Sequence, residues 1–191
     1  MRIIFLIFFL IFNLNPSFAK NGAGVEGGLA YGDIGAEETA QRIANLSGST
    51  TTVTYDEATY YARLFYEFDI TRESFIDVGY FFTGSLDATY TLSGASATES
   101  YFFNGFEGSY GFRSNDDFYI KGGFHQSEID GEASITIGGT TYAAQASASG
   151  TGFLLGGGID NGSTRYGLTY YDSVGGIEDA NLTILFYGIK F

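Results

Sequence analysis

The sequence predicts an all-β fold, an eight-stranded antiparallel up-and-down transmembrane β-barrel with short periplasmic turns and long extracellular hairpins. Three observations predict this fold. Apolar and small or polar residues alternate with period two in eight segments. The connections between those segments are alternately short and long. Beyond residue 19 the chain has no proline, which fits a chain built almost entirely of paired strands.

The first 19 residues have the pattern of a cleaved signal peptide. Met1 and Arg2 give a positive start, "IIFLIFFLIF" is an apolar run, and Ser17 and Ala19 are small residues at a plausible cleavage site. A transmembrane helix is the rival interpretation, but the run is much shorter than the ~20 residues that a spanning helix needs. We therefore expect residues 1–19 to be removed and residues 20–191 to form one barrel domain in a Gram-negative outer membrane.

Eight segments alternate in chain order, and each is long enough to cross a thin apolar layer. The first is "GVEGGLAY". One face of this segment carries Val25, Gly27, Leu29 and Tyr31, and the opposite face carries Glu26. The last is "NLTILFYGIKF", where Lys190 lies opposite the face of Phe191. The segments cover residues 24–31, 60–68, 75–82, 102–112, 118–125, 152–159, 165–171 and 182–191.

The connections have two lengths. "DITRES", "RSNDD" and "DNGS" are tight turns, and Asn161-Gly162 is a strong hairpin signal. The long, polar connections cover residues 33–57, 84–98, 127–147 and 172–180. Two of them, which contain "ATYTLSG" and "SITIGGTTYAA", still alternate, so we expect these hairpins to continue above the membrane.

The two faces of each segment differ in a way that favours a barrel over a secreted β-sandwich. Aromatic residues gather near both ends of the outward faces, as they do at the two interfaces of a membrane. The second face is rich in glycine and small residues, which suits the narrow interior of eight strands. Closure satisfies every backbone group inside lipid. Asn104 is the weakest outward assignment and could mark a bulge or the edge of the apolar band.

Charged residues recur on the inward faces, where they need partners or water. The acids and bases balance, which predicts an ion-pair network that braces and blocks the lumen; ordinary solvated lumen residues are the alternative. The predicted network is Glu26, Arg63, Glu67, Asp77, Glu107, Lys121, Arg165 and Lys190.

The chain resembles the small eight-stranded outer-membrane proteins: the OmpA transmembrane domain, the OmpX/Ail type and the opacity-like surface proteins. The resemblance covers the mature chain and rests on this architecture and on "ILFYGIKF" at the end. It implies that Leu185, Tyr187, Ile189 and Phe191 form the C-terminal signal read by the barrel-assembly machinery. It also implies contact with outer-membrane lipid and lipopolysaccharide.

The long-loop side is strongly acidic, with Arg42 as its one base. This charge and the net charge of −13 argue against a nucleic-acid partner. The main functional hypothesis is a monomeric structural and surface-interaction (adhesin-like) protein that meets an extracellular protein partner through its loops and exposed strand edges. The loop acids are Asp33, Glu37, Glu38, Asp56, Glu57, Asp87, Glu99, Glu128, Asp130, Glu132, Asp172, Glu178 and Asp179.

Two other functions stay open at this point. One is a small pore for ions or small solutes. The other is a lipid A acyl hydrolase, because His125 and Ser127 resemble the His-x-Ser pair that lipid A deacylases, which are also small outer-membrane barrels, carry on one strand. The pair is expected to face inward on the fifth strand rather than toward lipid, so we expect no enzymatic activity. We also expect no cofactor and no metal site.

Overall fold

Eight strands close into an antiparallel barrel, as predicted. The computed structural model describes residues 22–32, 35–48, 50–92, 95–114 and 117–191, so the predicted signal peptide lies outside the described residues. Each barrel strand pairs with the next, and the last pairs with the first. The strands are β1 (Gly22–Gly32), β3 (Ala58–Asp69), β4 (Ser74–Thr83), β6 (Ala95–Arg113), β7 (Phe118–Ile137), β8 (Thr140–Asp160), β9 (Thr164–Tyr171) and β10 (Leu182–Lys190).

The ring closes between the first and last strands. Val25 lies opposite Ile189 and Leu29 lies opposite Leu185, in a continuous antiparallel register. The amide of Phe191 donates to the carbonyl of Ala23 at 2.9 Å, so the pairing reaches the last residue. Closure leaves no open sheet edge in the ring, which is the condition for strands in hydrocarbon.

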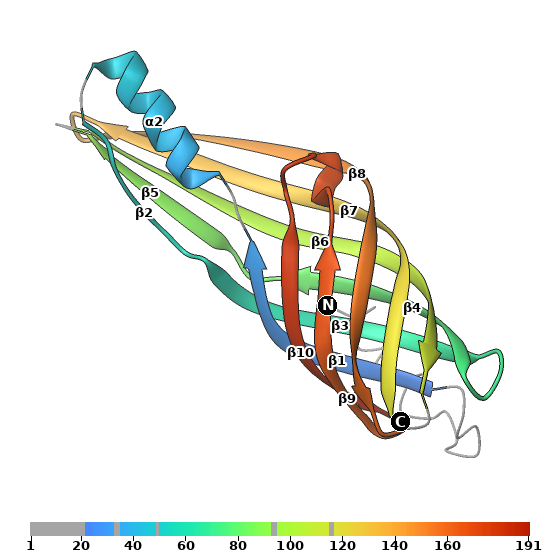
Figure 1. Ribbon diagram of the computed structural model, residues 1–191. Helices are drawn as coiled ribbons and strands as arrows, with labels where there is room; N and C mark the ends of the chain where they lie inside the picture. The colour runs from blue at the N-terminus through green and yellow to red at the C-terminus, as the bar shows by residue number, and fades with distance from the viewer. Residues whose placement is uncertain (1–21, 33–34, 49, 93–94, 115–116) are drawn as a thin grey trace, which may run out of the picture.

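Several strands continue far beyond the ring and form a flat extension on the long-loop side (Figure 1). Two short strands, β2 (Thr52–Tyr55) and β5 (Leu86–Leu92), join the upper halves of β6, β7 and β8 there. The strand order across the extension is β2-β5-β6-β7-β8. The predicted continuation of the two hairpins is confirmed. In addition, β2 directly precedes the second barrel strand, β3, and β5 directly follows the third barrel strand, β4.

Part of one long, polar connection is a helix. Residues 36–47 form α2 (Ala36–Ser47), which ends at Gly48 with φ 65°. Ala36 and Ala40 pack on Ala88 and Tyr90 of β5, so burial of the small face against the sheet stabilises the helix. The long connection predicted over 33–57 therefore contains a helix that was not predicted from the sequence. None of the helices in the described ranges is long and apolar enough to cross a bilayer.

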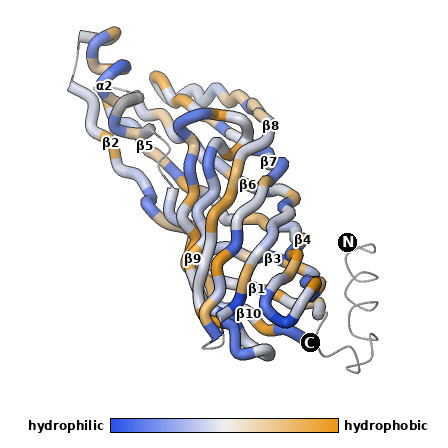
Figure 2. The backbone as a smooth tube through the Cα atoms, turned by 45° about the vertical axis from the view of Figure 1, so that its right-hand side comes forward, coloured by the Kyte–Doolittle hydropathy of each residue, from blue (hydrophilic) through white to orange (hydrophobic). Residues whose placement is uncertain are grey.

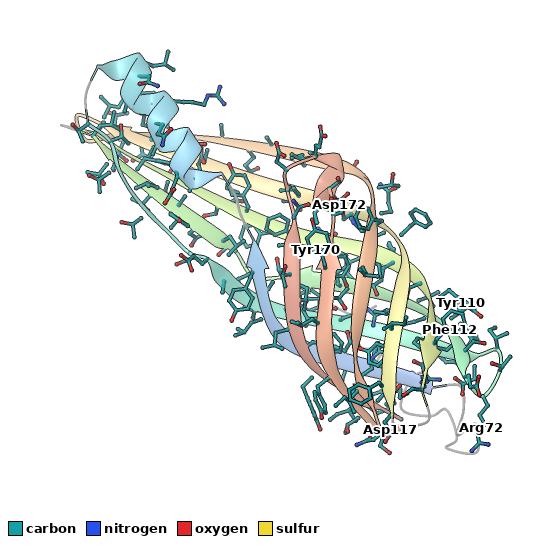
Figure 3. All side chains as sticks on the ribbon, viewed as in Figure 1. Arg72, Tyr110, Phe112, Asp117, Tyr170 and Asp172 are labelled. Atoms are coloured by element: carbon teal, nitrogen blue, oxygen red, sulfur yellow. The ribbon has the colours of Figure 1, made fainter. Side chains whose placement is uncertain are left out.

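The outward face of the barrel is apolar and aromatic. Tyr110 and Phe112 point away from the wall near the turn that carries Arg72, whereas Tyr170 and Asp172 mark the opposite end (Figure 3). Phe106 is 67% exposed and Phe124 is 75% exposed, and a belt of such large exposed aromatic side chains is typical of a surface that contacts membrane lipid. Hydrophobic and hydrophilic residues alternate along the barrel strands (Figure 2). Asn104 keeps its outward place without a bulge and accepts a hydrogen bond from Tyr80.

Candidate functional site

The lumen contains a connected set of buried ion pairs. Arg63 lies at its centre, contacts the carboxylates of Asp77 and Glu107, and places Nη1 3.2 Å from Glu26 Oε2. Arg165 also pairs with Glu26, and its Nη1 lies 2.8 Å from Asp77 Oδ2. The Lys121 Nζ to Glu107 Oε1 distance is 3.4 Å. All of these side chains are nearly inaccessible to solvent, so each charge depends on its partners.

A second group of charges lies in the lumen near the short turns. Lys190 Nζ lies 3.0 Å from Glu67 Oε1 and 2.6 Å from Asp160 Oδ2. Arg113 also contacts Glu67, and its Nη1 lies 2.7 Å from Asp69 Oδ1. Arg165 Nη1 lies 3.3 Å from Glu67 Oε2 and joins the two groups. The structure therefore brings the eight predicted lumen residues into one network.

Three members of this network were absent from the sequence-based prediction: Asp69, Arg113 and Asp160. They lie one step beyond the predicted strand segments, where the sequence was assigned to turns. Each continues the inward alternation of its strand, as Arg113 does after Glu107, Ser109 and Gly111. If each alternating segment had been continued by one residue, these three positions would have been predicted to face inward. With these additions, the network has six acids and five bases instead of four of each.

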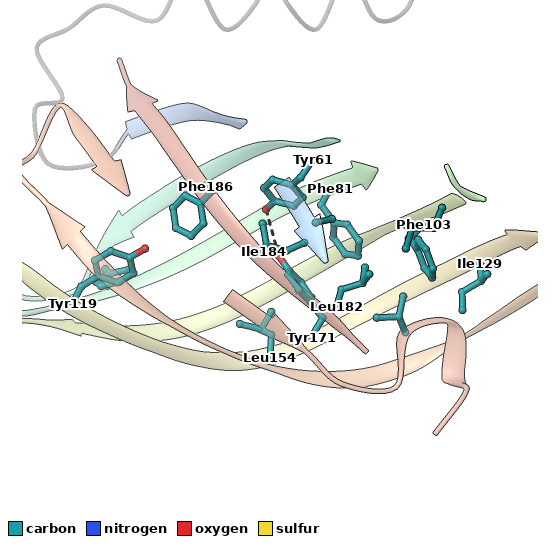
Figure 4. Close-up of a cluster of buried hydrophobic side chains, with 14 residues drawn as sticks. Tyr61, Phe81, Phe103, Tyr119, Ile129, Leu154, Tyr171, Leu182, Ile184 and Phe186 are labelled. Carbon is teal, nitrogen blue, oxygen red and sulfur yellow. Dashed lines mark hydrogen bonds between the residues drawn. The ribbon is translucent and has the colours of Figure 1, made fainter. Parts of the chain in front are cut away.

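A cluster of buried apolar side chains lies in the upper lumen (Figure 4). Leu182 and Ile184 of β10 are buried there with Phe81, Leu154 and Tyr171. This layer explains why the inner face of the last strand is apolar in its first half and charged at Lys190. The hydroxyls of Tyr61 and Tyr171 lie 3.4 Å apart, and both tyrosines also donate to lumen carboxylates.

His125 and Ser127 hold a loop over the mouth of the barrel. His125 Nε2 donates to the carbonyl of Asp172 at 2.8 Å, so Nδ1 accepts from the Ser127 hydroxyl at 3.0 Å. The Ser127 oxygen accepts in turn from the amide of Gly175 at 2.8 Å. Gly175 lies in η1 (Val174–Gly176), a turn that packs on β7 and β8. Both side chains are 2% exposed and face inward, away from lipid.

The residues implied as the C-terminal assembly signal all face outward. Leu185, Tyr187, Ile189 and Phe191 have exposed fractions of 49%, 54%, 44% and 53%. This is the apolar face that the final strand presents to its surroundings. Recognition of these residues by the assembly machinery stays a prediction.

One loop acid has a structural role inside the extension. Glu99 Oε2 accepts hydrogen bonds from the hydroxyls of Tyr90 and Tyr101, each at 3.1 Å. Burial, together with the Glu99 charge, raises the pKa of Tyr101 to about 12. Glu99 therefore braces β5 against β6 and does not belong to the solvated acidic surface. Asp33 lies outside the described residues, and Glu37 accepts from Tyr55.

The upper half of β8 is a free sheet edge. Its partner β9 pairs only with residues 154–160, and β7 covers the other side. The amide of Asp160, an even-numbered residue of β8, donates toward β7, whereas the carbonyl of Phe153, an odd-numbered residue, accepts from the amide of Asp172 on the other side. Because the direction alternates along a strand, the backbone groups of the odd-numbered residues of β8 point away from β7. The backbone groups of residues 141, 143, 145, 147 and 149 find no strand among the described residues. We call residues 140–149 the β8 edge.

An open pocket of about 440 Å³ lies beside the β8 edge, on the outward face of the extension. Phe102, Asp130 and Ser147 form one cross-strand row in it, and Glu132 and Gln145 belong to the next row. Gln145 donates to Glu132 at 2.9 Å. The pocket thus combines an aromatic ring with two carboxylates.

The ring of eight antiparallel strands, the lipid-facing belt and the extended hairpins define a small outer-membrane-type β-barrel. The structure of Ail, the attachment invasion locus protein of Yersinia pestis, aligns with a TM-score of 0.53 and 13% identity over 90% of this chain and 99% of that chain. Ail in complex with the heparin analogue sucrose octasulfate gives 0.54 and 12% over the same shares. At this identity the likeness extends to the fold alone, and it confirms the fold that the resemblance implied.

Neisserial surface protein A matches more weakly, with a TM-score of 0.35 and 13% identity over 88% of this chain and 95% of that chain. No protein-family model and no curated protein sequence matches the chain.

Proposed function

We propose that the chain is an outer-membrane protein that binds other proteins at the cell surface by adding an extended strand of the partner to the β8 edge. The barrel is its membrane anchor, and the extension carries the binding edge away from the bilayer. The observation that supports this proposal most directly is the β8 edge itself, which offers five residues with outward-pointing backbone groups.

The composition of this edge favours strand addition. Proteins commonly protect free edges with lysine, proline, bulges or a short strand. Residues 140–149 read "TTYAAQASAS", with no charge and no proline, and their register with β7 is unbroken. The opposite edge, β2, has only four residues and is followed by Asp56 and Glu57. Because the extension has an unprotected edge at β8 and a protected edge at β2, β8 is its one favoured docking strand.

The charge of the extension limits the class of partner. Ail has been crystallised with a polyanion, but here Arg42 is the one base on the long-loop side. Carboxylates such as Glu128 and Asp130 are exposed beside the β8 edge. Polyanionic partners are therefore disfavoured electrostatically, and a protein segment that is neutral or basic is favoured.

Amide hydrogen exchange of the protein in lipid nanodiscs tests the free edge. We expect alternation along the β8 edge, with fast exchange at odd residues and protection at even residues that donate to β7. Adding a soluble alternating Thr-Val peptide should protect the odd amides. Ala143→Pro, which removes only an outward-pointing N–H, should abolish this protection, whereas Ala143→Ser should retain it. Uniform protection of residues 141–149 in the free protein would refute the proposal.

We further propose that the ion pairs and the apolar upper layer close the lumen, so that the barrel is an anchor rather than a pore. Conductance of the refolded protein in planar bilayers tests this. We expect no stable open level for the native chain. Replacement of Arg63 by Ala removes the central cation and should produce measurable leakage if the folded barrel persists on a gel. A stable open level of the native chain would favour the pore.

A further inference from the structure

The pocket on the outward face adds a chemical requirement to this binding mode, and the inference rests on the proposed function. A strand that pairs with the β8 edge places every second side chain on the outward face, in line with the odd residues of β8. The residue opposite Ser147 would extend the row formed by Phe102, Asp130 and Ser147. This row leads from the added strand directly into the pocket.

We propose that the partner strand is basic and alternating, and that it places a lysine or arginine side chain across Ser147 into the pocket. Asp130 lies two strands away from the added residue. At the ordinary spacing between strands, the backbone of the added strand and the backbone of β7 are about 10 Å apart. The intervening Ser147 is small and leaves the path open. A long basic side chain together with the Asp130 side chain can bridge this gap, since such stems lie along a surface and keep the charge at the tip.

The pocket suits a cation in three respects. The carboxylate of Asp130 is exposed and is the one charge within the row itself. Glu132, already held by Gln145 at 2.9 Å, adds a second negative charge with a fixed position. Phe102 is 38% exposed and offers a ring face or edge beside the carboxylates. Carboxylates with an adjacent aromatic ring form a site that attracts ammonium and guanidinium groups.

The inward face of the same edge favours apolar side chains of the partner strand instead of basic ones. Tyr142 is 61% exposed, and Ile135 and Ile137 of β7 are 38% and 52% exposed. Ala144 and Ala146 continue this apolar surface along β8. The other side chains of the partner strand would lie here, so apolar residues are favoured. The partner is therefore a polypeptide segment that alternates basic and apolar residues.

Three peptides of equal length test this proposal by isothermal titration with the protein in nanodiscs. One alternates Lys and Val, one alternates Thr and Val, and one has Lys and Val in two blocks. The alternating basic peptide should bind at least about ten-fold more tightly than either other peptide, and more weakly at high salt. Asp130→Asn should weaken binding of the alternating basic peptide about two- to five-fold. Glu57→Gln, the same charge change at the opposite side of the extension, should have little effect.

Ala143→Pro, which lies outside the pocket, should abolish binding of both alternating peptides. Equal binding of the Lys-Val and Thr-Val peptides, still abolished by Ala143→Pro, would overturn the basic preference and leave strand addition intact. Equal binding of the block peptide would show unspecific attraction to an acidic surface and overturn the preference as well. Binding that ignores Ala143→Pro, or no binding of any peptide, would overturn both this inference and the proposed function.

Discussion

Buried charges in the lumen fit because neighbouring positions carry no side chain. The Cβ atom that an alanine would add at Gly79 would lie 2.6 Å from Arg63 Nε, within the most buried part of the network. Arg63 has no room to retreat, since Asp77, Glu107 and Glu26 surround its guanidinium. The absence of a side chain at Gly79 is therefore needed for Arg63 to reach its buried partners.

Gly79→Ala is expected to destabilise the barrel by about 1–3 kcal/mol, because it forces a buried, paired arginine out of its position. Urea unfolding from lipid vesicles measures the change. Gly108→Ala is the matched control, because its added Cβ would meet no atom within 4 Å. Equal stability of the two variants would mean that the lumen has more free space than these contacts imply.

The Tyr101 hydroxyl is expected to ionise well above the ordinary value of 10, with a pKa of about 12. A raised folded-state pKa means that this contribution to stability is complete below pH 10 and is lost as the pH rises toward 12. The ¹³Cζ shift of labelled tyrosine measures the titration. Glu99→Gln removes the charge that opposes ionisation and should lower this pKa. An unshifted titration in the variant would contradict the role given to Glu99.

At the scale of elements, α2 is the part of the extension that is bound least firmly. Its contacts with the sheet include Ala36, Ala40, the partly buried Ile43 and one hydrogen bond from Tyr55 to Glu37, and Leu46 is 89% exposed. These few contacts bury a small apolar area, so the docking free energy is small. We therefore expect a small change in the sheet beneath α2 to be enough to detach the helix from it.

Ala40→Asp is expected to undock α2, since it places a charge against Ala88 and Tyr90. Loss of about 2 kcal/mol of docking would raise the rate of tryptic cleavage after Arg42 about thirty-fold. Arg42 is the one trypsin site on the long-loop side, so intact vesicles give a clean readout. Gln41→Asp, at an exposed neighbouring position, should leave the rate near that of the native chain.

Alternation of residue types predicted the strands well, because one face of each meets lipid and the other fills a narrow lumen. It predicted the inward set from Glu26 to Lys190 for the same reason. The helix at 36–47 was not predicted, although Ala36, Ala40 and Ile43 have helical spacing, because its stability comes from β5. The β8 edge could not be found from one strand, since an edge is defined by the partner that a strand lacks.

At the scale of the molecule, the ring and the extension are unequal in stability. Every strand of the ring has two neighbours, whereas β2 and the upper half of β8 have one. The ring also encloses the charge network and the apolar layer. We therefore expect the ring to fold without the tip of the extension.

Replacing residues 134–143 by Asn-Gly tests this independence, because Ala133 and Ala144 face each other as a hydrogen-bonded pair, like Ile137 and Thr140 at the native turn, and a two-residue turn can join them. The shortened chain is expected to keep the heat-dependent gel migration of a folded barrel and the urea midpoint of the native chain within experimental error. Alternating exchange should remain at residues 145–149, which still pair with β7 on one side. Failure of the shortened chain to fold would mean that the extension is needed to assemble the ring.

The unbroken course of β7 and β8 has a mechanical consequence. Both strands run from the short turns to the tip without interruption, over 20 and 21 residues. A partner strand on the β8 edge would lie parallel to this direction, so tension between the bilayer and the partner would act along the hydrogen-bonded ladder. Its bonds would then be loaded together in shear rather than broken one at a time by peeling. The extension is built like a lap joint, in which resistance to pulling grows with the length of the overlap.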